Sequence, residues 1–88
     1  MNYRKHASNG LVLSPEELRA IRATLGSNIR RERKRKRTTM EDLSHMAGIH
    51  VTFLGHIELG SKAPSIHTLV RIARALAVPP AVLLRGVR

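Results

Sequence analysis

Two glycines divide the centre of this chain into short helical segments. Gly48 and Gly60 each follow a stretch in which apolar residues recur at helical spacing; these residues are Leu43, Ala47, Leu54 and Ile57. A glycine readily adopts the left-handed conformation that ends a helix, so each glycine marks a helix end. Residues 38–60 therefore predict two short helices joined by a tight turn at Gly48, the second running from about His50 to Leu59.

A dense run of positive charge precedes this helix pair. Residues 30–37 contain seven Lys or Arg residues and one Glu, and the whole chain carries a net charge of +10. Residues 1–37 account for +8 of that charge and residues 38–88 for +2. Charge segregated in this way favours a polyanionic partner, of which nucleic acid is the first choice and a membrane surface the second. A solvated basic face without a partner is the simplest alternative.

The bulk composition bounds the fold and the location of the protein. A chain of 88 residues is one small domain with a single modest core, and without cysteine it cannot use disulfides. No apolar stretch is long enough to cross a membrane, and the segment from Met1 to His6 lacks the apolar region of a signal peptide. We therefore expect a cytoplasmic protein with no membrane partner.

The N-terminal part contains an arm and a helix start. Residues 1–13 are expected to form the arm. Ser14 can cap a helix directly after it, because a proline suits the first turn and Glu17 can complete a capping box. The pattern leaves open whether this helix ends near Gly26 or continues to Lys36.

The C-terminal part contains two further helical segments. Ser65 can cap a helix whose broad apolar face consists of Ile66, Leu69, Val70, Ile72, Ala73 and Leu76. A last turn of helix follows Pro79-Pro80. No stretch of useful length alternates apolar and polar residues, so no strand is expected. The chain is predicted to be all-α.

Fixed offsets between particular residues extend the pattern beyond the helix pair. They run through Leu25-Gly26, Ile29, Arg33, Leu43, Gly48-Ile49, Leu54, Ile57-Glu58, Gly60, Pro64-Ser65, Leu69, residues 72–76 and Val78. On these residues, segment 25–86 resembles the lambda-repressor-like (Cro/repressor, xenobiotic-response-element) helix-turn-helix family. The resemblance implies a five-helix DNA-binding domain within residues 14–88, with an additional N-terminal helix. The string from Gly48 to Leu54 and the short length are also similar to restriction–modification controller proteins.

Several positions depart from the family pattern. The second helix of the family usually begins with a glutamine that contacts a DNA phosphate, and here Met40 stands in its place. Arg37 and Thr38 replace the usual glycine and leucine before it, and Ser44 replaces the alanine expected after Leu43. Methionine cannot form the phosphate hydrogen bond, so we expect Arg37 to supply that contact from a neighbouring position.

The second helix of the pair carries the candidate base-reading residues. The resemblance places Val51, Thr52 and His56 at base edges and His50 near the DNA backbone. Thr52 can donate, accept or contact a thymine methyl group, Val51 offers apolar contact, and His56 can hydrogen-bond a purine N7. None forms a bidentate pair with a base, so DNA shape is expected to contribute to recognition. The alternative for each is an ordinary exposed helix residue.

Backbone contacts are expected from the basic run and from the ends of the second helix. The candidates are Arg31, Arg35, Arg37, His50, Ser61 and Lys62. By the resemblance, Glu58 forms a structural ion pair with Arg33 that joins the basic helix to the recognition helix. The simpler alternative is a solvated glutamate at a helix end.

Neither a metal site nor catalytic machinery is expected. His45, His50 and His56 are not spaced to share a helix face, and the chain has no cysteine to join them. The His56-Ile57-Glu58 string matches part of the zinc-deaminase signature but lacks its cysteine partners. The chain has no glycine-rich phosphate loop, and its serines have capping or packing explanations. We expect no enzyme activity, no metal, no cofactor and no small-molecule ligand.

These observations predict a sequence-specific regulator that binds double-stranded DNA as a homodimer on a palindromic operator. Repression is the default, and RNA polymerase becomes a partner if the acidic pair Glu41-Asp42 supports activation. The alternative is an antitoxin or protein-interaction module of the same fold, whose main partner is another protein. Residues 11–25 could dock such a partner, and they or residues 82–84 could form the homodimer contact.

Overall fold

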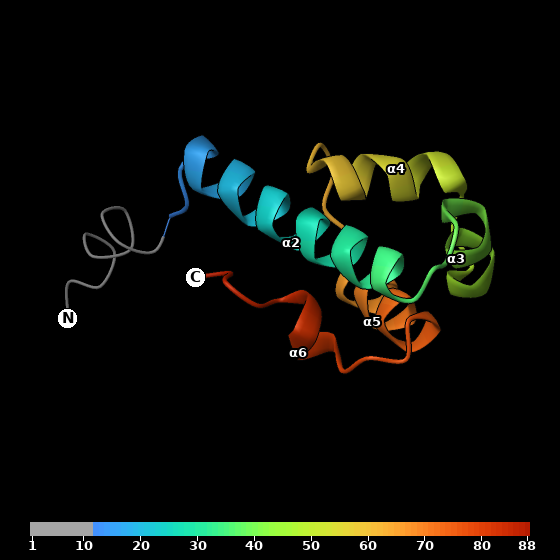
Figure 1. The fold of residues 1–88 in the computed structure, drawn as a ribbon. Coiled ribbons are helices and arrows are strands. Elements are labelled where there is room, and N and C mark those ends of the chain that lie inside the picture. Colours follow the sequence, from blue (N-terminus) through green and yellow to red (C-terminus); the bar gives the residue numbers. More distant parts are fainter. Residues whose placement is uncertain (1–11) are drawn as a thin grey trace.

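The computed structural model describes residues 12–88, which form five helices and no strand. In chain order the helices are α2 (Pro15–Arg35), α3 (Met40–Ala47), α4 (Val51–Leu59), α5 (Ile66–Ala75) and α6 (Pro80–Leu83) (Figure 1). The predicted all-α class is confirmed. Residues 1–11, which include most of the expected arm, lie outside the described part. None of the described helices combines the length and apolar character that a membrane crossing requires.

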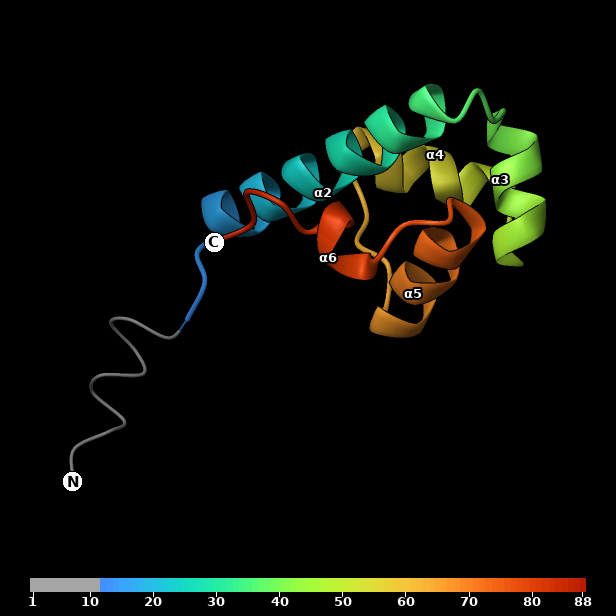
Figure 2. The same ribbon diagram turned by 60° about the horizontal axis from the view of Figure 1, so that its bottom comes forward.

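α2 is one continuous helix rather than two. Ser14 caps it reciprocally: the Glu17 N–H donates to Ser14 Oγ at 3.1 Å, and the Ser14 N–H donates to Glu17 Oε1 at 2.9 Å. The helix then runs for 21 residues without a break. The additional N-terminal helix is therefore the first half of α2, which projects beyond the other helices (Figure 2).

Gly26 lies inside α2 because two helices meet there. A Cβ atom at this position would clash with the carbonyl oxygen of Ile57 and would lie 2.6 Å from that of Glu58. Only glycine lets the α2 backbone approach the last turn of α4 so closely. One turn earlier, Arg22 Nε donates to the Gly60 carbonyl at 3.2 Å, which extends the same contact along α2.

α3 and α4 form the predicted pair of short helices. Thr39 caps α3, since its Oγ1 accepts a hydrogen bond from the Asp42 N–H at 3.0 Å. Gly48 (φ +69°) and Gly60 (φ +80°) adopt the left-handed conformation at the ends of α3 and α4. Both helices therefore end where the glycine spacing places their ends.

The core lies where α2, α3, α4 and α5 meet, and α6 closes it. Its buried residues are Leu25, Ile29, Leu43, Ala47, Leu54, Ile57, Leu69, Ile72, Ala73, Leu76 and Leu83. The apolar face of α5 is buried only in part, because Ile66 is 64% exposed and Val70 is half-buried. Both lie at the edge of the stripe that packs against the core, so the buried face is narrower than the apolar pattern predicts.

α4 and α6 contact different sides of α2. Gly26 faces α4, whereas Asn28, two residues further on, is buried against α6. Asn28 Nδ2 donates to the carbonyl oxygens of Leu83 at 2.9 Å and Arg85 at 2.8 Å. In Figure 1, α4 lies above the second half of α2 and α6 lies below it. The residues of α2 that contact α4 therefore differ from those that contact α6.

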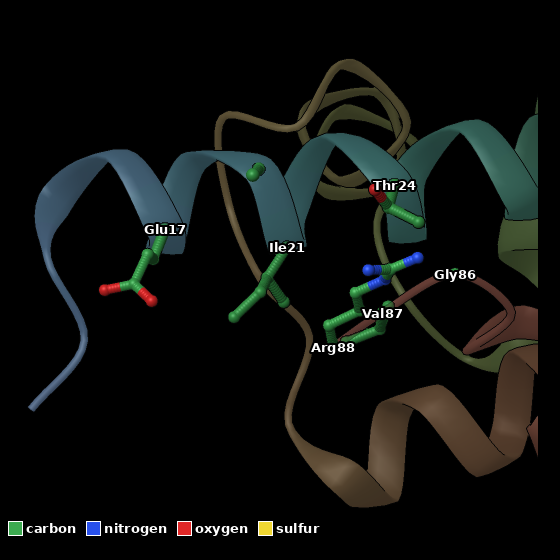
Figure 3. A pocket seen from close by; sticks show the side chains of 7 residues that line it. Glu17, Ile21, Thr24, Gly86, Val87 and Arg88 are labelled. Atoms are coloured by element: carbon green, nitrogen blue, oxygen red, sulfur yellow. The ribbon is translucent and has the colours of Figure 1, made fainter. Parts of the chain in front are cut away.

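The end of the chain returns to the first half of α2. Figure 3 shows Val87 and Arg88 lying beside Thr24 and Ile21. Together with Glu17, Ala20 and Gly86, these residues line a cavity of about 210 Å³. This hollow is formed without α4, so it is separate from the surface that the helix pair presents.

Candidate nucleic-acid interface

α4 is anchored by one face and exposes the other. Leu54 and Ile57 are fully buried in the core. The opposite face carries Val51, Thr52, Gly55, His56 and Leu59. Thr52 is exposed, Leu59 is 78% exposed, and the other three are half-buried. The structure thus brings the three predicted base-reading side chains together on one outward surface.

His50 caps the N-terminus of α4. Its ring Nδ1 accepts a hydrogen bond from the Thr52 N–H at 3.1 Å, as the side-chain oxygen of a Ser or Asp cap would. An accepting Nδ1 carries no hydrogen, so the neutral ring carries its hydrogen on Nε2. His50 therefore offers an N–H donor at the positive end of a helix, a position that favours a phosphate oxygen. The sequence predicted the phosphate contact but not the cap.

His56 and Ser61 form a hydrogen-bonded unit at the other end of α4. Ser61 Oγ donates to the backbone carbonyl of His56 at 3.1 Å, and His56 Nδ1 lies 3.2 Å from the same Oγ. The Ser61 side chain, predicted to contact the DNA backbone, is thus engaged with a predicted base-reading residue. Lys62, which follows it, is exposed.

Arg33 and Glu58 form the ion pair that the resemblance implied. Nε of Arg33 donates to Glu58 at 2.7 Å and Nη2 at 2.9 Å, while Nη1 donates to the Thr38 carbonyl at 3.1 Å. Only 12% and 5% of the two side-chain surfaces are exposed. The hydrogen bonds to Glu58 raise the pKa of Arg33, although burial acts in the opposite direction. The pair therefore holds α2, α4 and the α2–α3 connection in one arrangement.

Four arginines of the basic run lie on two different sides of α2. Arg30 and Arg33 lie on the α4 side, where they line a hollow of about 280 Å³ with Met40, Gly55, Glu58 and Leu59. Arg30 is exposed, so its charge is available beside the outward face of α4. The sequence alone does not distinguish Arg30 from the other members of the run, because their surroundings differ only once α4 is in place.

Arg31 and Arg35 lie on the α6 side. Arg31 Nη1 donates to Asn28 Oδ1 at 3.1 Å, and Arg35 donates to Glu32 through Nε at 3.1 Å and Nη2 at 2.7 Å. Glu32 is buried, and the hydrogen bonds from Arg35 lower its pKa below the ordinary value of 4.5. The structure therefore does not bring these two predicted phosphate contacts beside α4.

Arg37 and Met40 occupy the positions that depart from the family pattern. Arg37 has a φ of +54°, the left-handed conformation of the glycine usual there, and its side chain is exposed. This conformation costs a non-glycine residue about 1–2 kcal/mol. Met40 is half-buried and packs toward α4, since its Cε would lie 3.4 Å from a Cβ atom on Gly55. A cation thus stands where the family has none, and an apolar side chain replaces a polar one.

Comparisons with known proteins agree with this geometry. The sequence model of the helix-turn-helix family matches residues 29–83. An uncharacterised HTH-type transcriptional regulator of Sinorhizobium fredii, y4dJ, is 34% identical over 58 residues, which cover 66% of this chain and 75% of that protein. Control protein C.SmaI of Serratia marcescens is 29% identical over 70 residues, covering 77% of this chain and 83% of the relative.

A solved structure shares the fold. The crystal structure of the restriction-modification controller protein C.AhdI from Aeromonas hydrophila matches with a TM-score of 0.71 and 26% sequence identity. The match covers 73% of this chain and 97% of that one. The family predicted from residues 25–86 is therefore confirmed. The chain belongs to the helix-turn-helix family of DNA-binding transcriptional regulators.

Proposed function

We propose that this protein is a sequence-specific transcriptional regulator that inserts α4 into the major groove of double-stranded DNA. The observation that carries the proposal is the two-sided character of α4. One face is anchored in the core, and the other presents the base-reading candidates Val51, Thr52 and His56. An α-helix fits the width of the major groove, where side chains can reach base edges.

The three candidates divide the reading of bases by their chemistry. Val51 and the methyl group of Thr52 suit the thymine methyl, and the Thr52 hydroxyl can donate to or accept from a base edge. His56 supplies a ring nitrogen one turn further along the helix. No bidentate contact is available from these side chains, so base preference at each position is modest and DNA shape adds to it.

Phosphate contacts come from cations and donors that border α4. Arg37, His50 and Lys62 from the predicted set retain this role, because each is exposed next to an end of α3 or α4. Arg30 joins them from the α4 side of α2. Arg31 and Arg35, which are hydrogen-bonded on the α6 side, add only diffuse attraction. Ser61 acts through His56 instead of through a phosphate.

The regulator acts as a homodimer on a palindromic operator. Two copies of α4 related by a twofold axis would enter successive major grooves about 34 Å apart. We assign the dimer contact to the end of α6 and the first half of α2. Leu18 and Leu84 lie there, each 40% exposed, and neither belongs to the outward face of α4.

Repression by blocking RNA polymerase is the proposed mode of action. The likeness to C.SmaI and C.AhdI supports a role as a controller of a restriction–modification system. Glu41 and Asp42 are exposed in the first turn of α3, which provides an acidic surface for polymerase if the protein activates instead. A reporter gene placed behind the operator distinguishes the two signs of regulation.

Selection of bound sites from a random DNA library, followed by gel-shift titration, tests the proposal. A palindromic motif bound by a dimer is expected. For about six neutralised phosphates, affinity falls on the order of a thousandfold between low and physiological salt. Absence of a motif, together with tight co-purification of one protein, would favour the interaction module instead.

A further inference from the structure

We infer that His56 reads an exocyclic amino group, adenine N6 or cytosine N4, by accepting a hydrogen bond at Nε2. The tautomer that makes this possible is set by Ser61. The inference rests on the proposed function, because it assumes that the outward face of α4 meets base edges. It differs from the expectation based on the sequence alone, in which His56 donates to a purine N7.

The geometry around Ser61 Oγ allows two arrangements of hydrogens. Oγ lies 3.1 Å from the His56 carbonyl oxygen and 3.2 Å from His56 Nδ1, but a hydroxyl has only one hydrogen to donate. In the first arrangement Oγ donates to the carbonyl and accepts from an Nδ1–H. In the second, Oγ donates to a bare Nδ1.

The first arrangement is favoured because it makes both short contacts hydrogen bonds. The second leaves Oγ and the carbonyl oxygen 3.1 Å apart with no hydrogen between them, so two partly negative oxygens would repel each other. The same carbonyl also accepts from the backbone N–H groups of Ser61 at 3.0 Å and Lys62 at 3.3 Å, and such shared hydrogen bonds are common at helix ends. The preference for the first arrangement therefore rests on the 3.1 Å separation of Oγ and the carbonyl oxygen, which requires a hydrogen between them.

The tautomer decides which bases His56 can pair with. A neutral ring with its hydrogen on Nδ1 has a bare Nε2, which can only accept. In the major groove, adenine N6 and cytosine N4 are donors, whereas guanine N7 and O6 and thymine O4 are acceptors. Neutral His56 therefore pairs with adenine or cytosine and leaves two acceptors facing each other at guanine. One such hydrogen bond corresponds to about three- to tenfold in affinity.

His50, the N-cap of α4, and His56, within α4, thus have opposite tautomers. His50 accepts at Nδ1 from the Thr52 N–H and keeps a donor at Nε2, which suits a phosphate oxygen. His56 donates at Nδ1 to Ser61 and keeps an acceptor at Nε2, which suits a base amino group. One helix therefore presents the same side chain as a phosphate donor at its start and as a base acceptor near its end.

Nitrogen-15 NMR of the free protein tests the tautomers without DNA, in a buffer basic enough to keep imidazole neutral. Correlations to the ring protons are expected to show hydrogen on Nδ1 for His56 and on Nε2 for His50. In the Ser61→Ala variant, the His56 preference is expected to shift toward Nε2, while His50 stays unchanged and serves as the internal control. Hydrogen on Nε2 of His56 in the unmodified protein would overturn the inference.

Operators with modified bases test the recognition step. The relevant position is the one at which His56→Ala loses base preference. Purine deoxyriboside in place of adenine, or 2-pyrimidinone in place of cytosine, removes the amino group and is expected to weaken binding about three- to tenfold. 7-Deaza-adenine, which lacks only N7, is expected to have no effect. His56→Ala, measured on the same duplexes, reports the effect of weakened base pairing alone. The loss of about three- to tenfold is therefore expected in the unmodified protein relative to this variant.

The outcomes separate the two proposals. Sensitivity to 7-deaza-adenine and not to loss of the amino group overturns the inference, as does a His56→Ala variant that keeps every base preference. If no operator can be selected at all, the proposed function fails and base reading fails with it. In that case the NMR result still reports whether Ser61 sets the tautomer.

Discussion

Arg33 donates two parallel hydrogen bonds to Glu58, at 2.7 Å and 2.9 Å, across the contact between α2 and α4. The pair connects the helix that carries the basic run to the helix that carries the base-reading candidates. A bidentate pair fixes the relative angle of two helices better than one point contact, because two guanidinium nitrogens and both carboxylate oxygens must align. We therefore expect the pair to control both stability and the orientation of α4.

Replacing Glu58 with Gln should destabilise the fold by about 2–4 kcal/mol. Removing one partner leaves a largely buried guanidinium without its counter-charge. The loss in the free energy of unfolding therefore lies between the values for breaking an exposed ion pair and a fully buried one. Urea denaturation of the variant measures the free energy of unfolding. DNA affinity should also fall under conditions in which the variant remains folded, because α4 loses its fixed angle.

The chain offers a matched control in an exposed pair on the same helix. Arg19 and Glu16 are 63% and 74% exposed and 3.5 Å apart. Glu16→Gln should therefore change the free energy of unfolding by less than about 1 kcal/mol. Equal effects of the two glutamine substitutions would show that burial does not strengthen the Arg33–Glu58 pair.

Replacing Gly26 with Ala should destabilise the protein even though Ala favours helices. The new methyl group would meet the backbone carbonyls of Ile57 and Glu58, neither of which can move without shifting α4. Overpacking of this kind costs about 1–3 kcal/mol, more than the gain of about 1 kcal/mol in helix propensity. The midpoint temperature of thermal unfolding should therefore be lower than in the unmodified protein.

Gly55→Ala is the opposite case on the outward face of α4. The atom that a Cβ would meet there is the flexible Met40 Cε at 3.4 Å, so the substitution should stabilise the helix by up to about 1 kcal/mol. If DNA approaches this face closely, the same variant binds its operator more weakly while melting higher. Gly26→Ala is the comparison for this variant. If it also stabilises the fold, the backbones of α2 and α4 do not pack closely enough at Gly26 to exclude a methyl group.

Local signals in the sequence predicted the helix boundaries well. Ser14 and Ser65 each accept a hydrogen bond from the backbone three residues further on, and Gly48 and Gly60 end their helices. These interactions involve neighbours in sequence, so residue type and spacing are sufficient to identify them. The Arg33–Glu58 pair came instead from the family resemblance, which already contains the tertiary arrangement.

Long-range partners explain what the sequence did not predict. Gly26 reads as a possible helix end until the carbonyl groups of α4, over thirty residues later, are placed against it. Asn28 reads as a surface amide until Leu83 and Arg85 supply its two acceptors. The basic run could not be divided between α4 and α6 for the same reason. Each role depends on where a distant segment packs.

The neighbours Arg30 and Arg31 should differ in their effect on DNA binding. Arg30 lies on the α4 side of α2, whereas Arg31 is hydrogen-bonded to Asn28 on the α6 side. Arg30→Ala should weaken binding to all sequences and reduce the salt slope by about 0.9 per protomer, the value for one phosphate. Arg31→Ala removes the same charge and should leave the salt slope nearly unchanged. Equal salt slopes for Arg30→Ala and Arg31→Ala would contradict the proposal that Arg30 contacts a phosphate and Arg31 does not.

Acid should destabilise the protein partly through Glu32. Its pKa is lowered in the folded state by the hydrogen bonds from Arg35, so its contribution is complete above the unfolded-state pKa and is lost as pH falls through the folded-state pKa. The free energy of unfolding should therefore decline as pH falls below about 4.5, the ordinary pKa of the group. Urea titrations at several pH values measure this decline.

Two variants isolate that contribution of Glu32. Glu32→Gln cannot titrate at this position, so the decline should be shallower than in the unmodified protein. Arg35→Gln removes the first cause of the lowered pKa and should flatten part of the same decline, while nearby Arg85 and Lys36 keep the rest. A Glu32→Gln profile parallel to that of the unmodified protein would assign the acid sensitivity to other groups.

Arg37→Gly should stabilise the fold and weaken DNA binding at the same time. Glycine adopts the left-handed φ of +54° without strain, which gains about 0.5–1 kcal/mol after the larger entropy of the unfolded glycine is subtracted. The lost cation should remove one phosphate contact per protomer and reduce the salt slope accordingly. Ala77→Gly is the control, since Ala77 has a φ of +57° and lies outside the proposed interface. Ala77→Gly should gain similar stability and leave the salt slope of DNA binding unchanged. If Arg37→Gly also leaves the salt slope unchanged, Arg37 does not contact a phosphate.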